Sequence, residues 1–202
     1  MNRLQNNHAP ADSHNWSRTN LTRKYDVLVV DDYPDTLLVV KRFLEDAGLT
    51  CCAVESGQKS LEQIHQGNIP RLVLLDIMMP DISGYGVLKT IRKTFPATDL
   101  PVIMFTGRTD VESLVKSYQT GANDYIIKPF SKDELIARVQ CHLDLQKAHE
   151  TFQKNLMLQK GLLQQKQKEA DARLDAREQK REKLRYQINP HFVFTSLASM
   201  RG

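Results

Sequence analysis

The stretch that decides the fold is Leu72-Val73-Leu74-Leu75-Asp76, a short apolar run that ends in a carboxylate. Three more apolar runs end in polar residues: Val27-Leu28-Val29-Val30 before Asp31-Asp32, Val102-Ile103-Met104-Phe105 before Thr106, and Tyr125-Ile126-Ile127 before Lys128-Pro129. Such runs, alternating with helical patterns, indicate buried parallel strands joined by crossover helices. Ligands bind at the carboxyl ends of such strands, so we expect five polar residues to converge on one edge: Asp31, Asp32, Asp76, Thr106 and Lys128.

The order of the elements predicts an α/β fold for residues 25–145, with a five-stranded doubly wound parallel sheet. Helical patterns begin near Pro34, Gly57, Gly84, Asp110 and Ser131. Ser131-Lys132-Asp133-Glu134 has the form of a capping box, which predicts the start of the fifth helix. Cys51-Cys52 fall in the second strand, where adjacent side chains point to opposite faces, so metal binding by this pair is not expected.

The five polar residues have a common chemical logic. Asp31, Asp32 and Asp76 would repel one another unless a cation lay between them, and their hard oxygen ligands suit Mg²⁺. Asp76 can act as a nucleophile toward phosphorus, and Lys128 can neutralise charge on the transferred group. Thr106 could donate a hydrogen bond to a phosphoryl oxygen. Taken alone, an Asp-Asp pair after a strand is usually a turn or a helix cap, and a Lys-Pro pair is usually part of a loop. The five polar residues together predict phosphoryl chemistry.

Residues 25–145 resemble the receiver domain of bacterial two-component response regulators, a flavodoxin-like fold. The resemblance is carried by Asp31-Asp32, by residues 75–85 with the sequence LDIMMPDISGY, by Thr106-Gly107, by Gly121-Ala122 and by residues 125–130 with the sequence YIIKPF. It implies that Asp76 is the phosphoacceptor in a phosphotransfer that the receiver itself catalyses. It also implies that Asp32, Asp76 and the carbonyl of Met78 bind Mg²⁺, that Asp31 holds metal-bound water, and that Thr106 and Tyr125 form the switch. A degenerate receiver that keeps the fold without phosphorylation is the alternative.

Composition is typical of a soluble cytoplasmic protein. The chain has 202 residues, 26% charged and 41% hydrophobic, and no apolar stretch long enough to span a bilayer. Three cysteines do not make a disulfide framework. Residues 1–24 lack periodicity, and we expect a disordered leader there.

Residues 146–187 predict a coiled-coil signalling helix continuous with the fifth helix. No proline occurs between Ser131 and Pro190, and only Gly161 interrupts the helix-forming composition, as a weak point or a hinge. A polar helix that could extend on the order of 80 Å needs a partner, so we expect a homodimer, parallel or antiparallel. Its association should be weak or adjustable in register, because Gln159, Lys166, Arg177 and Arg181 fall near seam positions. The apolar candidates for the seam are Leu145, Phe152, Leu156, Leu163, Ala170, Leu174, Leu184 and Ile188.

The charge of this helix invites a second interpretation. Residues 146–187 contain 11 Lys or Arg and 6 Asp or Glu, a net charge of +5, whereas the rest of the chain, with 17 cations and 18 anions, has −1. A basic leucine zipper places a concentrated basic block before a regular heptad, but here acids are mixed among the cations. We therefore favour a solvated coiled-coil face over a nucleic-acid interface.

Residues 188–202 resemble the start of the phosphoacceptor region of LytS-like sensor histidine kinases. The resemblance is carried by residues 186–197, with the sequence YQINPHFVFTSL, and places His191 at the phosphorylated position. A neutral imidazole is a competent nucleophile toward phosphorus. Thr195 stands where that family usually has Asn, and no nucleotide-binding boxes follow. The chain is thus not expected to make its own phosphohistidine, and an ATP-binding kinase domain would have to come from elsewhere. The alternative is a helix start with a surface histidine.

The sequence therefore predicts a phosphorelay module. Asp76 accepts a phosphoryl group from the phosphohistidine of a cognate histidine kinase or phosphotransfer protein, and a dimeric helix transmits the change toward His191. The chain would then be a short protein or part of a hybrid kinase. The alternative function is a non-enzymatic adaptor, in which phosphorylation controls dimerisation and the basic helix docks a protein or nucleic acid.

Overall fold

The computed structural model describes residues 23–107 and 111–187, except the side chains of residues 111–114 and 186–187. Most of the predicted leader, and the predicted phosphoacceptor segment with His191, lie outside these ranges. The chain divides into two compact units at residue 149, and each is described by itself. No helix among the described residues is both long and apolar enough to cross a membrane.

The first unit contains the predicted five-stranded parallel sheet, with the strand order β2-β1-β3-β4-β5. The strands are β1 (Val27–Val30), β2 (Cys51–Val54), β3 (Leu72–Asp76), β4 (Val102–Thr106) and β5 (Asp124–Ile127). All four strand pairs are parallel, and β1, β3 and β4 are buried along their whole length. Three of the four predicted runs are therefore buried strands, whereas the run Tyr125-Ile126-Ile127 in β5 is only partly buried.

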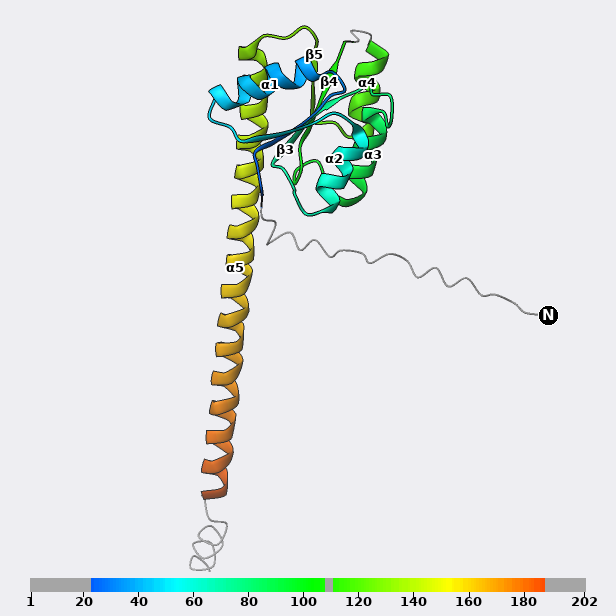
Figure 1. Cartoon of the computed structure of the whole chain (residues 1–202). Helices are drawn as coiled ribbons and strands as arrows, with labels where there is room; N and C mark the ends of the chain where they lie inside the picture. The colour runs from blue at the N-terminus through cyan, green and yellow to red at the C-terminus, as the bar shows by residue number, and fades with distance from the viewer. Residues whose placement is uncertain (1–22, 108–110, 188–202) are drawn as a thin grey trace, which may run out of the picture. The chain divides into compact units, whose positions relative to one another are not determined.

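Five helices alternate with these strands, as the doubly wound fold requires (Figure 1). They are α1 (Pro34–Asp46), α2 (Gly57–His65), α3 (Gly84–Thr94), α4 (Val111–Thr120) and α5 (Lys132–Gln187). The predicted starts agree with these bounds to within one residue. Of the predicted capping box, Ser131 is confirmed, because its Oγ accepts a hydrogen bond from the Glu134 amide at 3.1 Å. The Glu134 carboxylate instead pairs with Arg138 at 3.2 Å.

Each face of the sheet is covered by its own apolar core. Helices α1 and α5 pack on one face, and α2 and α3 pack on the other (Figure 1). Cys51 packs against the first of these cores and Cys52 against the second, so the two side chains point to opposite faces as predicted. Period-two alternation along the strand thus assigns each residue to a face.

Buried polar contacts fasten the edges of the sheet to its helices. The guanidinium of Arg92 on α3 donates to the carbonyls of Gly121, Phe95 and Leu100 and to Asn123 Oδ1, at 2.7 to 3.3 Å. Burial lowers the pKa of Arg92 to about 10. The side chain remains charged at neutral pH and holds the α3 side of the domain to the loop before β5.

The N-terminal part of α5 is held to the sheet at two levels. Burial alone would raise the pKa of Asp124 on β5, but hydrogen bonds from His142, the Tyr125 amide and Arg138 outweigh it and lower that pKa. Further along, Gln146 is 2% exposed, and its amide nitrogen donates to the carbonyls of Arg71 and Asp99 at 2.9 and 2.8 Å. These contacts fix α5 on the domain as far as Gln146.

Candidate functional site

The register of the sheet brings the predicted polar residues to one edge. Val30 pairs with Leu75, so Asp31 follows β1 beside the end of β3, where Asp76 stands. Asp76 pairs with Phe105, the residue before Thr106. Thr106 in turn pairs with Ile127, the residue before Lys128. The carboxyl ends of four strands therefore place the residues side by side, as the sequence predicted.

Lys128 joins the two buried carboxylates of this edge. Its ammonium nitrogen lies 2.6 Å from Asp31 Oδ2 and 2.6 Å from Asp76 Oδ1. Burial alone would lower the pKa of Lys128, but its hydrogen bonds to Asp31 and Asp76 outweigh this and raise the pKa. The lysine is therefore a fixed cation at neutral pH, within reach of any group attached to Asp76.

The Asp76 carboxylate is oriented on both of its oxygens. Oδ1 pairs with Lys128, and Oδ2 accepts a hydrogen bond from the amide of Met78 at 2.6 Å. The residue is 5% exposed, and this burial raises the pKa of Asp76 against the opposing effect of Lys128, with the charge of Asp31 adding to the rise. A second cation near the site would offset both the burial and the Asp31 charge.

The residues present fit a hard cation in their chemistry. Oδ1 of Asp32 is buried and lacks a hydrogen-bond partner, one of two such side-chain oxygens in the described part of the chain. A buried carboxylate oxygen that lacks a partner is the type of hard donor that Mg²⁺ takes. No three acidic, His or Cys side chains among the described residues are already grouped as metal ligands. In this structure Lys128 neutralises Asp31 and Asp76 instead.

The two predicted switch residues lie on neighbouring strands. Thr106 is 4% exposed at the end of β4, and its carbonyl accepts the Lys128 amide at 2.7 Å. Tyr125 on β5 is half-buried, and its ring meets that of Tyr118 on α4 edge-on, with 6.0 Å between centroids. Thr106 therefore lies at the acidic edge, and Tyr125 contacts the α4 side of the domain.

The loop after β3 contains contacts that sequence reasoning missed. Asp81 Oδ1 and Oδ2 accept hydrogen bonds from the amides of Gly57 and Gln58, at 3.3 and 2.8 Å, and so cap α2 from another part of the chain. A Cβ built on Gly84 would lie only 2.1 Å from the carbonyl oxygen of Asp76. The run from Asp76 to Gly84 was recognised as a motif, but the reason for its glycine is this close approach of two backbones.

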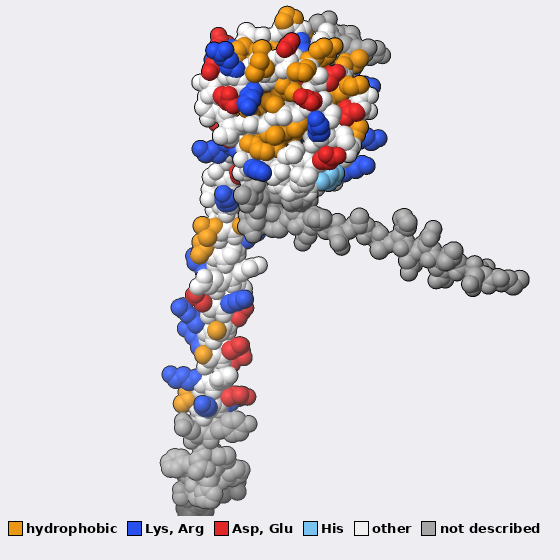
Figure 2. All heavy atoms as spheres, viewed as in Figure 1, with side chains coloured by type: hydrophobic (Ala, Val, Ile, Leu, Met, Phe, Trp, Pro, Cys, Tyr) orange, Lys and Arg blue, Asp and Glu red, His pale blue; other side chains and the backbone are white. Residues whose placement is uncertain are grey.

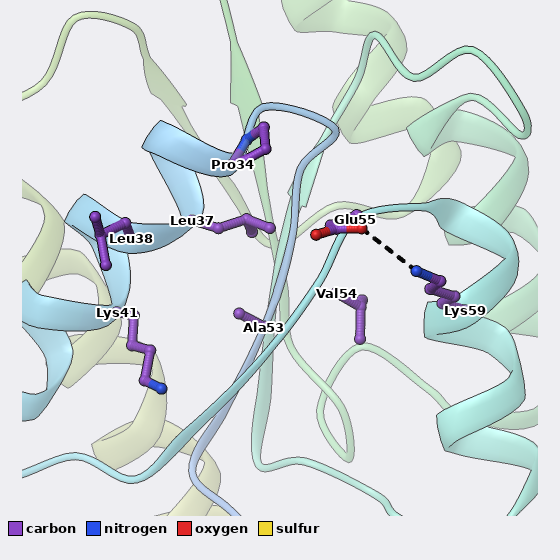
Figure 3. A pocket seen from close by; sticks show the side chains of 8 residues that line it. All are labelled: Pro34, Leu37, Leu38, Lys41, Ala53, Val54, Glu55 and Lys59. Carbon is purple, nitrogen blue, oxygen red and sulfur yellow. Dashed lines mark hydrogen bonds and ion pairs between the residues drawn. The ribbon is translucent and has the colours of Figure 1, made fainter.

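A shallow groove of about 370 Å³ lies between α1 and β2, next to the loop that carries Asp31 and Asp32 (Figure 3). Leu37, Leu38 and Val54 give it an apolar wall, and an ion pair between Glu55 and Lys59, 3.4 Å apart, stands at its rim. Leu38 is 69% exposed. The groove contains none of the predicted phosphoryl-binding residues.

The second unit is the helix beyond residue 149, which continues without a break through Gly161. The predicted seam residues in the described range are exposed, except Leu156, which is half-exposed. Exposed large apolar side chains, which the seam prediction did not include, are Met157, Leu158 and Leu162. Ile188 and His191 lie outside the described residues. Dimerisation therefore stays a prediction.

Comparison with known proteins agrees with this geometry. The family model of the response regulator receiver domain matches residues 27–140, which is more than half of the chain. The probable transcriptional regulator ycf27 of Galdieria sulphuraria is 40% identical over 124 residues, covering 61% of this chain and 47% of that protein. The DNA-binding transcriptional regulator NtrC of Escherichia coli is 42% identical over 114 residues, covering 56% of this chain and 24% of that protein.

Solved structures give the same result. A CheY-like response regulator receiver domain protein from Methanospirillum hungatei is 30% identical with a TM-score of 0.58, covering 62% of this chain and 98% of that one. NtrX from Brucella abortus is 34% identical with a TM-score of 0.59, covering 64% of this chain and 29% of that one. The chain spans about half the length or less of the curated relatives it matches. With its acidic edge and its lysine in place, the chain belongs to the response regulator receiver family.

Proposed function

We propose that Asp76 accepts a phosphoryl group from the phosphohistidine of a histidine kinase or phosphotransfer protein. The observation that carries the proposal is the oriented carboxylate, with Lys128 Nζ 2.6 Å from Oδ1 and the Met78 amide 2.6 Å from Oδ2. In the transfer, an Asp76 oxygen forms a bond to phosphorus while the bond from phosphorus to the donor imidazole nitrogen breaks. Lys128 neutralises charge on the transferred oxygens.

Mg²⁺ would be held by Asp32, Asp76 and the carbonyl of Met78, with Asp31 binding metal-bound water. The support is the buried, unpartnered Oδ1 of Asp32, a residue that directly follows Asp31 at the edge where Asp76 also stands. When bound, the cation supplies positive charge that stabilises the transferred phosphoryl oxygens. Asp31 and Asp76 then no longer depend on Lys128 alone for neutralisation, which leaves the ammonium free to follow the phosphoryl group.

Phosphorylation would act on the switch residues. A phosphoryl group on Asp76 offers acceptor oxygens to the hydroxyl of Thr106, which stands on the next strand. We expect Thr106 to move toward the phosphate and Tyr125 to turn inward, away from its edge-on contact with Tyr118. The face formed by α4, β5 and α5 would change as a result.

We further propose that two copies associate through α5 and that the helix transmits the change toward His191. The support is a 56-residue helix whose surface beyond residue 149 exposes repeated Leu, Met and Phe side chains. A helix of this length does not gain stability from burial unless it has a partner. His191 would then serve as a phosphoacceptor for a kinase domain or as an intermediate station.

The mixed charge of the helix does not favour the nucleic-acid alternative. Acidic residues recur among the cations, whereas a nucleic-acid interface concentrates Lys and Arg on one continuous face. A steep fall in DNA affinity with rising salt would favour that alternative instead.

The test is labelling with acetyl phosphate in the presence of Mg²⁺, with the phosphorylated fraction measured by intact mass. Wild type should gain one phosphoryl group, and Asp76→Asn should gain none. Asp35→Asn is the matched control, because Asp35 is an exposed carboxylate in the first turn of α1 and should label like wild type. Labelling of Asp76→Asn at the wild-type rate would refute the assignment.

A further inference from the structure

Charges of one sign predominate on each side of the C-terminal half of α5. In Figure 2 most blue side chains lie along one edge of the lower part of the helix and most red side chains lie along the other. All side chains from residue 157 to residue 185 are exposed, so folding of the single chain does not account for this arrangement. The positions of the charges relative to the predicted seam therefore carry information about a partner.

A heptad register in this half follows from the seam itself. Leu163, Ala170 and Leu184 are spaced by multiples of seven, and Leu174 lies four residues after Ala170. This spacing places Leu163, Ala170 and Leu184 at d positions and Leu174 at an a position. At about 100° per residue these side chains form one stripe along the helix.

The flanks of this stripe have opposite charge. The residues that precede the a positions, the g flank, are Lys166, Arg173 and Lys180. Among the residues that follow the d positions, the e flank, Asp171 and Glu178 are acidic, and the flank ends in Arg185. One edge of the seam is thus cationic at three successive positions, and the other is neutral at Gln164, anionic at Asp171 and Glu178 and cationic at Arg185.

We infer that residues 163–185 of two copies pair in parallel and in register. In a parallel pair, the g flank of each helix meets the e flank of the other, five residues further along. Lys166 then faces Asp171 of the second copy, and Arg173 faces Glu178 of the second copy. Two-fold symmetry doubles both pairs, which gives four interhelical ion pairs. This inference rests on the proposed dimerisation and adds its orientation.

The antiparallel arrangement has the opposite electrostatics. There each g flank meets the other g flank and each e flank meets the other e flank, so the three cations of the g flank face one another. Like charges at these positions oppose association. The charged flanks therefore favour the parallel orientation, while the few apolar seam residues can pack in either orientation.

Association should nevertheless be weak. Arg177 and Arg181 occupy consecutive seam positions, and in a parallel pair each faces the same arginine of the second copy. Lys180 and Arg185 also oppose each other at the last flank contact. Exposed ion pairs contribute little individually, so the charges select the orientation more than they strengthen the dimer.

Charge exchange distinguishes the two orientations. In a parallel dimer, K166E/R173E places acid against acid and D171K/E178K places cation against cation, so each double variant should raise the dimer dissociation constant by about tenfold. The quadruple variant that carries all four changes restores opposite charges and should return to within about twofold of wild type. In an antiparallel dimer each flank meets the same flank of the other copy, so K166E/R173E adds acids to a flank that keeps Lys180 and should not weaken the dimer.

The measurement is sedimentation equilibrium of the full chain, with Mg²⁺ and beryllofluoride, with helicity checked by circular dichroism. Loss of dimer in both double variants and its recovery in the quadruple variant is the expected result. A dimer that is unaffected by the double variants, or not restored by the quadruple one, overturns the parallel arrangement alone. A wild type that stays monomeric overturns dimerisation and this inference together. Acetyl phosphate labelling, which all variants should retain, tests the Asp76 assignment separately.

Discussion

Gly84→Ala should disturb the phosphoacceptor without touching a side chain of the site. A Cβ at this position would lie 2.1 Å from the Asp76 carbonyl oxygen and 3.0 Å from both the Asp76 carbonyl carbon and the Ile77 Cα. Since Cβ atoms essentially never approach other atoms closer than 3.0 Å, the two backbones must separate by about 0.9 Å. All three neighbours are backbone atoms, so no side-chain rotation can relieve the contact.

The expected cost of this separation is at the upper end of overpacking effects, about 3 kcal/mol. For a domain of this size that corresponds to a fall in Tm of roughly 12 °C. The displacement also moves Asp76 relative to Lys128, and a shift of about 1 Å in a reacting group can cost roughly 100-fold in rate. Acetyl phosphate labelling should therefore slow far more than partial unfolding alone would explain.

Gly86→Ala is the matched control. It lies two residues further along α3, where a Cβ would meet only the side chains of Ile82, at 3.0 Å, and Ser83, at 3.7 Å. Scanning calorimetry gives the Tm of each variant, and intact mass gives its labelling rate. If Gly84→Ala matches Gly86→Ala in both measurements, the close approach of the two backbones does not constrain Asp76 and the reasoning is wrong.

Three further predictions concern charged side chains. Lys128→Met should slow acetyl phosphate labelling by roughly 100-fold, because the cation 2.6 Å from Asp76 is lost while the length of the chain is kept. Arg92→Lys should lower the unfolding free energy by about 2 kcal/mol, because an ammonium cannot replace a guanidinium that donates to four acceptors. Calorimetry measures this loss, and the rate of acetyl phosphate labelling should not change. The lowered pKa of Asp124 contributes stability above about pH 4 that is lost as pH falls through its folded value. The loss of unfolding free energy caused by Asp124→Asn should therefore be complete at pH 7 and smaller below about pH 4. A loss that does not change with pH would contradict this.

The strand ends and their polar residues could be predicted from the sequence because each rests on local pattern. A buried parallel strand must be apolar along its length, so the first polar residue after it marks the edge of the sheet. Asp76, Thr106 and Lys128 were each found in this way. The helix starts could be predicted from equally local signals, since Ser131 and Pro34 are residues that favour the start of a helix.

The contacts that the sequence did not reveal join residues far apart in the chain. Asp81 caps α2 although it lies more than 20 residues after that helix begins, and no spacing rule connects the two. The sequence pattern places Arg92 as a surface cation at the end of an amphipathic helix, but it is partly buried and hydrogen-bonded to four acceptors. Such partners depend on tertiary packing, which overrides the usual preference of charged residues for water.

Lys128 links the chemistry at Asp76 to the start of α5. Two residues separate it from Ser131, whose hydroxyl caps that helix, and one of them, Phe130, packs on Phe105 with ring centroids 5.3 Å apart. Phosphorylation replaces the single negative charge of the Asp76 carboxylate with about two on the phosphoryl group, next to an ammonium that already divides its contacts between two carboxylates. We therefore expect Lys128 to shift from Asp31 toward the phosphoryl oxygens and to displace this short connection.

The contacts of Gln146, further along α5, determine what form that displacement takes. Gln146 is buried and bound to two loop carbonyls, so α5 is held at that point whatever happens at Asp76. A helix that is fixed near Gln146 and displaced near Ser131 cannot slide along its axis. It can only rotate or tilt about the fixed point, and a rotation changes which flank of its exposed half faces a second copy. A parallel seam with charged flanks is sensitive to this kind of motion, because rotation separates Lys166 from Asp171 of the second copy before it exposes the apolar stripe.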